Sequence, residues 1–210
     1  MTNLPFDTVG IDADEVSALE KTYALLQSKF KLVLPGKVDL HVNKFELFNN
    51  NPDTVIGGSF IINTPKNTSY LTFIKNHFSV SAGSRGGGSQ NLEYDKYQVW
   101  AFVTLSKDFG RVLIRKKTFT DSMLEIVNHV ELKIDDDQQF NSKYHVVAND
   151  KQKAIEGLTP ELRAILMAVK NPALVIEIVN NTLTIGNNEP IDPELIVYLA
   201  EVANEIAEVA

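Results

Sequence analysis

The 210-residue sequence contains no cysteine, and this absence excludes several kinds of site at the outset. Disulfide frameworks, cysteine-ligated zinc, iron–sulfur clusters and thiol catalysis all require that residue. Apolar runs such as Val99–Val103 and Ala164–Val169 fall far short of the roughly 20 residues that a membrane-spanning helix needs. Residues 1–8 show neither the basic region nor the apolar stretch of a secretory signal. We therefore expect a cytoplasmic protein without a transmembrane segment.

Positive charge is also scarce, since 20 Lys+Arg stand against 27 Asp+Glu and give a formal net charge of −7. Binding along a phosphate backbone needs a clustered basic surface, so this balance argues against nucleic acid as a partner. The glycine-rich residues 83–88 lack the Lys-Ser/Thr of a phosphate-binding loop, and no Gly-x-Ser-x-Gly motif of a serine hydrolase occurs. We expect the glycines to form the tip of a hairpin, where Arg85 is available to a partner.

Hydrophobic periodicity predicts a helix followed by a long run of strands. Apolar residues recur at steps of three and four over residues 12–30, which predicts an amphipathic helix capped by Asp12. From residue 37 to about 115 the period changes to two, which is typical of half-buried strands. Short turns without intervening helices indicate an antiparallel meander. The predicted strands span residues 38–43, 45–48, 54–62, 69–81, 93–105 and 111–115, with 69–81 and 93–105 forming one long hairpin.

Helical patterns return in the C-terminal part of the sequence and complete the fold prediction. Asp192 and Pro193 mark the start of a final helix with an apolar stripe and an acidic polar side. The other predicted elements are a helix at 121–128, strands near 130–134 and 143–148, helices from 149 or 150 through 157 and from 159, and a hairpin of strands 175–179 and 182–185 across Asn180-Asn181. The sequence therefore predicts an α+β fold, with an N-terminal helix, an antiparallel sheet meander and C-terminal helices packed on the sheet.

No linker marks a domain boundary, so we expect a single domain over residues 1–210. Within it, residues 1–30 supply the N-terminal helix, residues 37–148 are mainly sheet, and residues 149–210 form helices with a small hairpin.

The densest basic segment spans residues 107–117 and is the first candidate interaction surface. Alternation along a strand places several of its cations on one face, and Phe109 and Phe119 lie among them, which suits an acidic or nucleic-acid partner. The alternative, favoured by the overall negative charge, is a strand whose exposed face is simply charged, which also hinders edge pairing. For the acidic face of the final helix a solvated surface is favoured, and the alternative is docking to a basic partner or to residues 107–117 of a second copy. The candidate surface residues are Lys107, Arg111, Arg115, Lys116, Lys117 and Arg85.

The histidines and the acidic turn at 135–137 are candidates for metal chemistry. No two histidines lie at helical spacing, so no local zinc motif exists, and structural or surface roles are favoured. The alternative is a site assembled across strands from His41, His77 or His145 with nearby acids, as in a metal-dependent or hydrolase-like enzyme. The turn offers carboxylates to a hard cation, but consecutive side chains on a turn diverge, which favours a solvated turn. We expect no bound metal and no cofactor.

Several segments carry a resemblance to a known family. They are Asp108–Arg115, Phe140–Asp150 and Leu158–Leu162, followed by Asn181–Ile185. In this order they resemble an uncharacterised prokaryotic domain-of-unknown-function family, many of whose members carry membrane-anchoring helices ahead of the shared domain. The likeness covers roughly residues 95–200 and implies no enzyme activity or catalytic residue.

The function expected from the sequence is that of a non-enzymatic binding or interaction module, whose partner, a protein or a second copy of the chain, the sequence does not identify. The segregation of charge between residues 107–117 and the final helix motivates this hypothesis. Because the dispersed histidines could assemble a site across strands, a metal-dependent or hydrolase-like enzyme stays open as an alternative. The family resemblance adds a third hypothesis, a peripheral component of a membrane-associated assembly.

Overall fold

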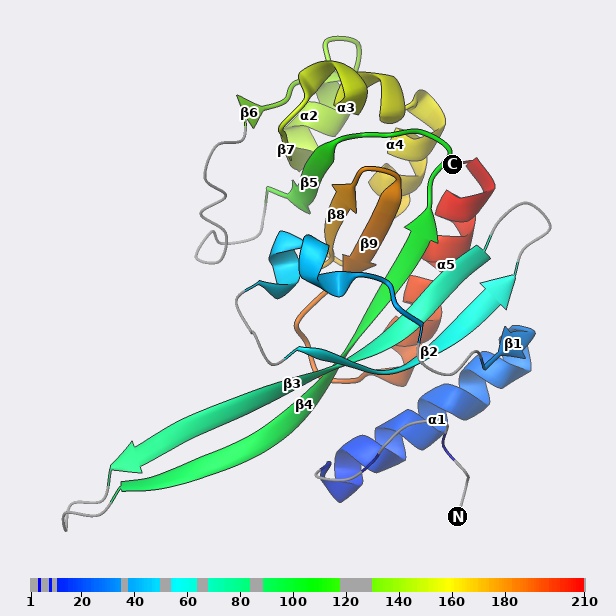
Figure 1. Cartoon of the computed structure of the whole chain (residues 1–210). Helices are drawn as coiled ribbons and strands as arrows, with labels where there is room; N and C mark the ends of the chain where they lie inside the picture. Colours follow the sequence, from blue (N-terminus) through cyan, green and yellow to red (C-terminus); the bar gives the residue numbers. More distant parts are fainter. Residues whose placement is uncertain are drawn as a thin grey trace.

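The computed structural model describes residues 4, 8, 11–34, 38–49, 54–63, 68–83, 89–117 and 130–209. Within these residues, an N-terminal helix and C-terminal helices pack on a single antiparallel sheet of nine strands (Figure 1), so the predicted α+β class is confirmed. The helices are α1 (Ala13–Lys29), α2 (Gln138–Lys143), α3 (Lys151–Gly157), α4 (Pro160–Ala168) and α5 (Pro193–Val209), with 3₁₀ turns η1 (Val42–Lys44) and η2 (Glu46–Phe48). The strands are β1 (Leu32–Val33), β2 (Val55–Asn63), β3 (Thr68–Gly83), β4 (Ser89–Thr104), β5 (Arg111–Lys116), β6 (Val130–Glu131), β7 (Tyr144–Ala148), β8 (Val175–Val179) and β9 (Thr182–Gly186).

The strand order across the sheet is β1-β2-β3-β4-β9-β8-β5-β7-β6. The first four strands follow one another as a meander, but the β8–β9 hairpin then lies between β4 and β5. This hairpin, predicted across Asn180-Asn181, is confirmed. Its turn holds the β4–β5 connection, because the amides of Leu105 and Phe109 donate to the carbonyls of Asn181 and Asn180. Gly110 adopts a φ of 68°, which glycine tolerates, and turns the connection into β5.

The predicted first and last helices are confirmed together with their caps. The Asp12 carboxylate accepts from the Glu15 amide at 2.8 Å at the start of α1, and the Asp192 carboxylate accepts from the Glu194 amide at 3.0 Å ahead of α5. Helix α5 packs against β3, β4 and α1, and it also contacts α4 (Figure 1). The main core therefore lies between these helices and one face of the sheet, and it includes Leu19, Leu26, Phe60, Phe73, Leu199 and Ile206.

The strands predicted over residues 38–43 and 45–48 are wrong. This segment instead forms η1 and η2, which cover the face of the sheet opposite α5. Phe45 and Phe48 are both buried there, and one 3₁₀ turn places residues three apart on the same side, whereas a strand would place them on opposite faces. Their rings pack on β3 and β4 in a second core of Phe45, Phe48, Ile74, Trp100 and Phe102.

The long hairpin of β3 and β4 extends beyond the rest of the sheet. Strand β2 accompanies β3 only as far as Lys75, and β9 accompanies β4 only as far as Trp100. From the His77–Asp95 pair to the Gly83–Ser89 pair, β3 and β4 are therefore paired with each other alone in the described ladders. We call these residues, 77–83 and 89–95, the β3–β4 arm, which projects from the body in Figure 1.

The predicted hairpin of residues 69–81 and 93–105 is thus confirmed. Residues 84–88 of its glycine-rich tip, including Arg85, lie outside the described residues, as does the helix predicted over residues 121–128. At the base of the arm, Asp95 joins the two strands through contacts with Lys75 Nζ at 2.7 Å and His77 Nδ1 at 2.8 Å.

Candidate functional site

Arg111, from the predicted basic surface, makes contacts inside the molecule. Its Nη1 lies 2.6 Å from Glu177 Oε1 on the neighbouring strand β8, and its Nη2 donates to the Lys44 carbonyl at 2.8 Å. Glu46 Oε1 lies 3.4 Å from the same Nη1. The Arg111 side chain is 25% exposed and the Glu177 side chain only 2% exposed. Arg111 therefore ties β5 to β8 and to the segment that carries η1 and η2.

Glu177 is the centre of this arrangement. Its two carboxylate oxygens accept from the amides of Glu46 and Leu47, each at 3.0 Å, in addition to the Arg111 contact. Burial raises the pKa of Glu177, and the two amide hydrogen bonds and Arg111 oppose that rise. The Arg111–Glu177 pair thus fastens residues 44–47 over the second core.

Two further basic residues of the predicted surface serve as hydrogen-bond donors to helix ends. Lys116 Nζ donates to the carbonyls of Val169 and Lys170, just after α4, where a cation complements the negative end of the helix. Burial lowers the pKa of Lys116. Lys107 Nζ donates to the Glu156 carbonyl in the last turn of α3 at 3.1 Å.

Lys107 also lines a pocket of about 380 Å³ near the C-terminal end of α5. Its lining combines apolar side chains with Lys107, Glu161 and Glu208. The charges that line this pocket are therefore mixed.

Two further members of the predicted surface lie in β5 and directly after it. Arg115 is half-buried in β5 and lies opposite His145 of β7 in the sheet register. Lys117 is exposed just beyond β5, and its amide donates to the Lys143 carbonyl at 2.9 Å. The role of these residues in partner binding stays a prediction.

The structure places the three described histidines apart, each beside one carboxylate. His41 lies 3.1 Å from Asp39, His77 lies 2.8 Å from Asp95, and His145 lies 3.5 Å from Glu131. His129 lies outside the described residues. In the part of the chain that the structure describes, no three His, Asp or Glu residues gather into a group suited to a metal ion.

The acidic turn at residues 135–137 is held by an arginine that the sequence did not single out. Arg163 of α4, whose side chain is 8% exposed, lies 2.9 Å from Asp137 and 3.4 Å from Asp136. It also donates to the Leu158 carbonyl at 2.9 Å. Asp137 caps α2 through the Phe140 amide at the same time. The guanidinium therefore supplies the cation for two of the three carboxylates.

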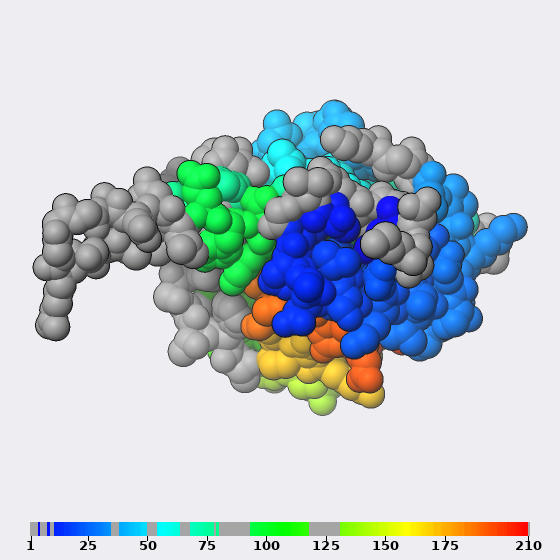
Figure 2. Space-filling view, turned by 90° about the horizontal axis from the view of Figure 1, so that it is seen from below, coloured from blue at the N-terminus to red at the C-terminus, as the bar shows by residue number. Residues whose placement is uncertain are grey.

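The base of the β3–β4 arm borders a pocket of about 460 Å³ that faces solvent. Figure 2 shows the elements that form it side by side, namely the start of α1 in blue, β4 in green and the loop before α5 in orange. Four carboxylates line it, from Asp12, Glu15, Asp95 and Glu189, together with Lys96. We call this the outer pocket.

Glu15 shows how the carboxylates of the outer pocket affect one another. Its Oε1 accepts weakly from the Tyr97 amide at 3.4 Å. Burial raises the pKa of Glu15, and the negative charges of Asp12 and Asp95 add to the rise, while the Tyr97 amide and Lys96 oppose it. With four carboxylates against one lysine, the lining of the outer pocket carries an excess of negative charge.

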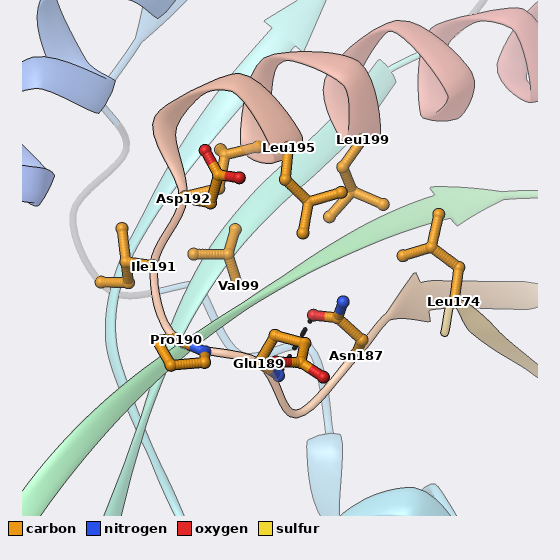
Figure 3. A pocket seen from close by; sticks show the side chains of 10 residues that line it. Val99, Leu174, Asn187, Glu189, Pro190, Ile191, Asp192, Leu195 and Leu199 are labelled. Carbon is orange, nitrogen blue, oxygen red and sulfur yellow. Dashed lines mark hydrogen bonds between the residues drawn. The ribbon is translucent and has the colours of Figure 1, made fainter. Parts of the chain in front are cut away.

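A smaller hollow, the inner pocket, adjoins the outer one and shares Glu189 and Pro190 with it. Figure 3 shows it beneath the start of α5, with Leu195 and Leu199 above and Asn187 below. Asn187 is 8% exposed, and its Oδ1 accepts from the Glu189 amide at 3.3 Å. Its Nδ2 has no hydrogen-bond partner among the described residues. The inner pocket thus presents one unused donor in apolar surroundings, in a volume of about 10 Å³.

No helix within the described ranges is both long enough and apolar enough to cross a bilayer. No protein-family model matches the sequence, and no curated protein matches it. The resemblance to a domain-of-unknown-function family therefore stays a prediction.

A search of solved structures does find a match. The chain is similar to the crystal structure of the mycobacterial trehalose monomycolate transport factor A, with a TM-score of 0.54 over 93% of each chain. The two sequences are 5% identical over this match. At that identity the similarity shows that the two proteins share a fold, and no residue role is transferred by it.

Proposed function

We propose that the protein is a non-enzymatic interaction module that contacts a partner protein through the β3–β4 arm. The observation that supports this proposal is the arm itself, whose strands continue well past the last pairings with β2 and β9. An isolated two-stranded ribbon gains little stability in water, and its outer edges offer backbone groups for strand addition. The arm therefore adds little to the packing of the body and suits contact with another chain.

Site-specific photo-crosslinking in cells tests this proposal. A photoreactive amino acid replaces Ser79, an exposed residue of the arm, and the matched control replaces Ser142, an exposed residue of α2 on the body. We expect a discrete crosslinked protein from position 79 and none of that size from position 142. Equal crosslinking from both positions, or none from position 79, contradicts the proposal.

A shortened arm provides a second test. Replacing residues 79–93 by Asn-Gly retains the pairing of residues 78 and 94 around a two-residue turn. We expect the partner identified by crosslinking to be lost from this variant. The emission of Trp100, the single tryptophan of the chain, checks that the second core stays intact.

A second candidate function is that of a peripheral component of a membrane-associated assembly in the cytoplasm. The support is the shared fold with a protein described as a transport factor, together with the family resemblance of residues 95–200. Fractionation of cells tests it: we expect the protein in the membrane fraction at low salt and its release by high salt. Recovery entirely in the soluble fraction under both conditions counts against this function.

A further inference from the structure

The charge around the outer pocket favours a cationic ligand. Asp95 is already paired with Lys75 and His77, but Asp12, Glu15 and Glu189 form no ion pair among the described residues. Lys96 is the cation that lines the pocket, and its Nζ lies 5.5 Å from the ring centroid of Tyr94. A cleft with excess charge of one sign concentrates ligands of the opposite sign. Anions are correspondingly disfavoured here.

The inner pocket points to the second feature of the ligand. A buried amide N–H without an acceptor costs free energy, so Asn187 Nδ2 is suited to an incoming oxygen atom. Glu189 and Pro190 line both pockets and are exposed, and the 3.3 Å hydrogen bond from the Glu189 amide to Asn187 Oδ1 is a long one. Movement of these two residues would therefore disrupt little buried surface and would give a ligand oxygen access to the Asn187 amide group.

We propose that the outer and inner pockets together bind a lysine or arginine side chain of a partner polypeptide. The cationic group lies between the carboxylates of Asp12 and Glu15, and a backbone carbonyl beside that residue accepts from Asn187 Nδ2 once Glu189 and Pro190 have moved aside. The volume of the outer pocket, about 460 Å³, lies within the range of ligand sites. The need for a cation and a neighbouring acceptor favours a polypeptide over a small amine. This inference rests on the proposed function, because it gives the chemistry of the partner.

Binding of defined peptides to the purified full chain tests the inference. The probe is a fluorescein-labelled acetyl-Gly-Ser-Arg-Ser-Gly-amide, and its control carries Gln in place of Arg. Anisotropy near physiological salt should detect saturable binding of the Arg peptide, and the Gln peptide should bind at least tenfold more weakly. Equal binding of the two peptides overturns the inference. Unlabelled arginine amide that competes as strongly as the unlabelled peptide overturns the assignment to a polypeptide.

Two matched substitutions distinguish the pocket from the general negative charge of the protein. Glu15→Gln retains an oxygen for the Tyr97 amide while it removes the charge, so the fold should survive. Glu20→Gln removes the same charge from the same helix at a position that does not line the outer pocket. We expect Glu15→Gln to lower the affinity for the Arg peptide about tenfold and Glu20→Gln to change that affinity less than twofold. Equal weakening by both contradicts a specific site.

Asn187→Leu tests the inner pocket by a different measurement. Without ligand this variant should unfold at higher denaturant concentration, because a buried unpaired donor is removed. The same variant should bind the Arg peptide about fivefold more weakly, because the hydrogen bond from Asn187 Nδ2 is lost. Unchanged affinity excludes Asn187 from the site. The shortened-arm variant should still bind the peptide, so failure of the arm as a partner contact and failure of the pocket give different results.

Discussion

Replacing Arg111 by Met should destabilise the protein by about 3 kcal/mol at pH 7. The variant keeps the length of the side chain but leaves the Glu177 carboxylate, 2% exposed, without its cation. Removing one partner of a buried pair costs about 3–5 kcal/mol in general. The lower value applies here because Arg111 is 25% exposed and two amides still donate to Glu177.

The cost of Arg111→Met should depend on pH in a defined direction. Burial already raises the pKa of Glu177 in the folded protein, and loss of Arg111 raises it further. A carboxyl group whose pKa is higher in the folded than in the unfolded state has no effect on stability at pH below both values. Its destabilising effect grows as pH rises above the unfolded pKa and is complete above the folded pKa. The destabilisation should therefore shrink as the pH is lowered from 7 toward the ordinary pKa of a glutamate side chain, because Glu177 takes up a proton in the folded state first.

Urea unfolding followed by Trp100 emission measures both effects, because Trp100 lies in the second core that residues 44–47 cover. The double variant Arg111→Met with Glu177→Gln serves as the control. It removes the unpaired charge and should be more stable than Arg111→Met alone. A cost below about 1 kcal/mol, the value of a surface ion pair, or a cost that is independent of pH would refute this reasoning.

Three other substitutions test separate parts of the fold by the same unfolding assay. Gly186→Ala should cost about 1–3 kcal/mol and alter the emission of Trp100, because its Cβ would lie 2.6 Å from the Trp100 ring. Arg163→Met should cost about 2 kcal/mol, since the buried Leu158 carbonyl loses its donor. Lys116→Met should lower the free energy of unfolding by about 1 kcal/mol, because it removes the donor to the carbonyls at the end of α4. An unchanged urea midpoint would show that this contact contributes nothing to stability.

Elements with local signals could be predicted from the sequence. Asp12 and Asp192 are capping residues that act within one turn of their own helix, so α1 and α5 were recognisable from short segments. The β8–β9 hairpin was recognisable because its strands alternate around Asn180-Asn181. The insertion of this hairpin between β4 and β5 depends on pairings such as Ala101 with Ile185, which are far apart in the chain. No local pattern records such a pairing.

The segment of residues 38–49 shows why alternation alone is insufficient. Its apolar residues are spaced as in a strand, and Leu40 and Val42 do pack against the second core. The contacts that decide its conformation are the packing of Phe45 and Phe48 and the hydrogen bonds from two of its amides to Glu177. The partners in these contacts lie on other strands. A short segment without a neighbouring strand satisfies its backbone locally, which favours 3₁₀ turns.

The candidate site was harder to predict than the fold because its residues come from separate elements. Glu177 could be noticed as an acid within the apolar run Val175–Val179, but its partner Arg111 is 66 residues away. Asn187 has no distinguishing signal in the sequence, since its importance lies in burial without an acceptor for Nδ2. The outer pocket likewise needs α1, β4 and the loop before α5 to meet.

The distribution of charge in the folded chain changes which partner the protein suits. Arg111, Lys107 and Lys116 use their cationic groups to hold other parts of the same chain. Cations engaged in this way contribute less to the attraction of an acidic partner, because their charge is already opposed by carboxylate or carbonyl oxygens. The carboxylates of Glu15 and Glu189, in contrast, form no ion pair among the described residues and line a pocket together with Lys96. Part of the excess negative charge of the sequence thus lies at the outer pocket beside the arm, and the proposal of a basic partner rests on this distribution.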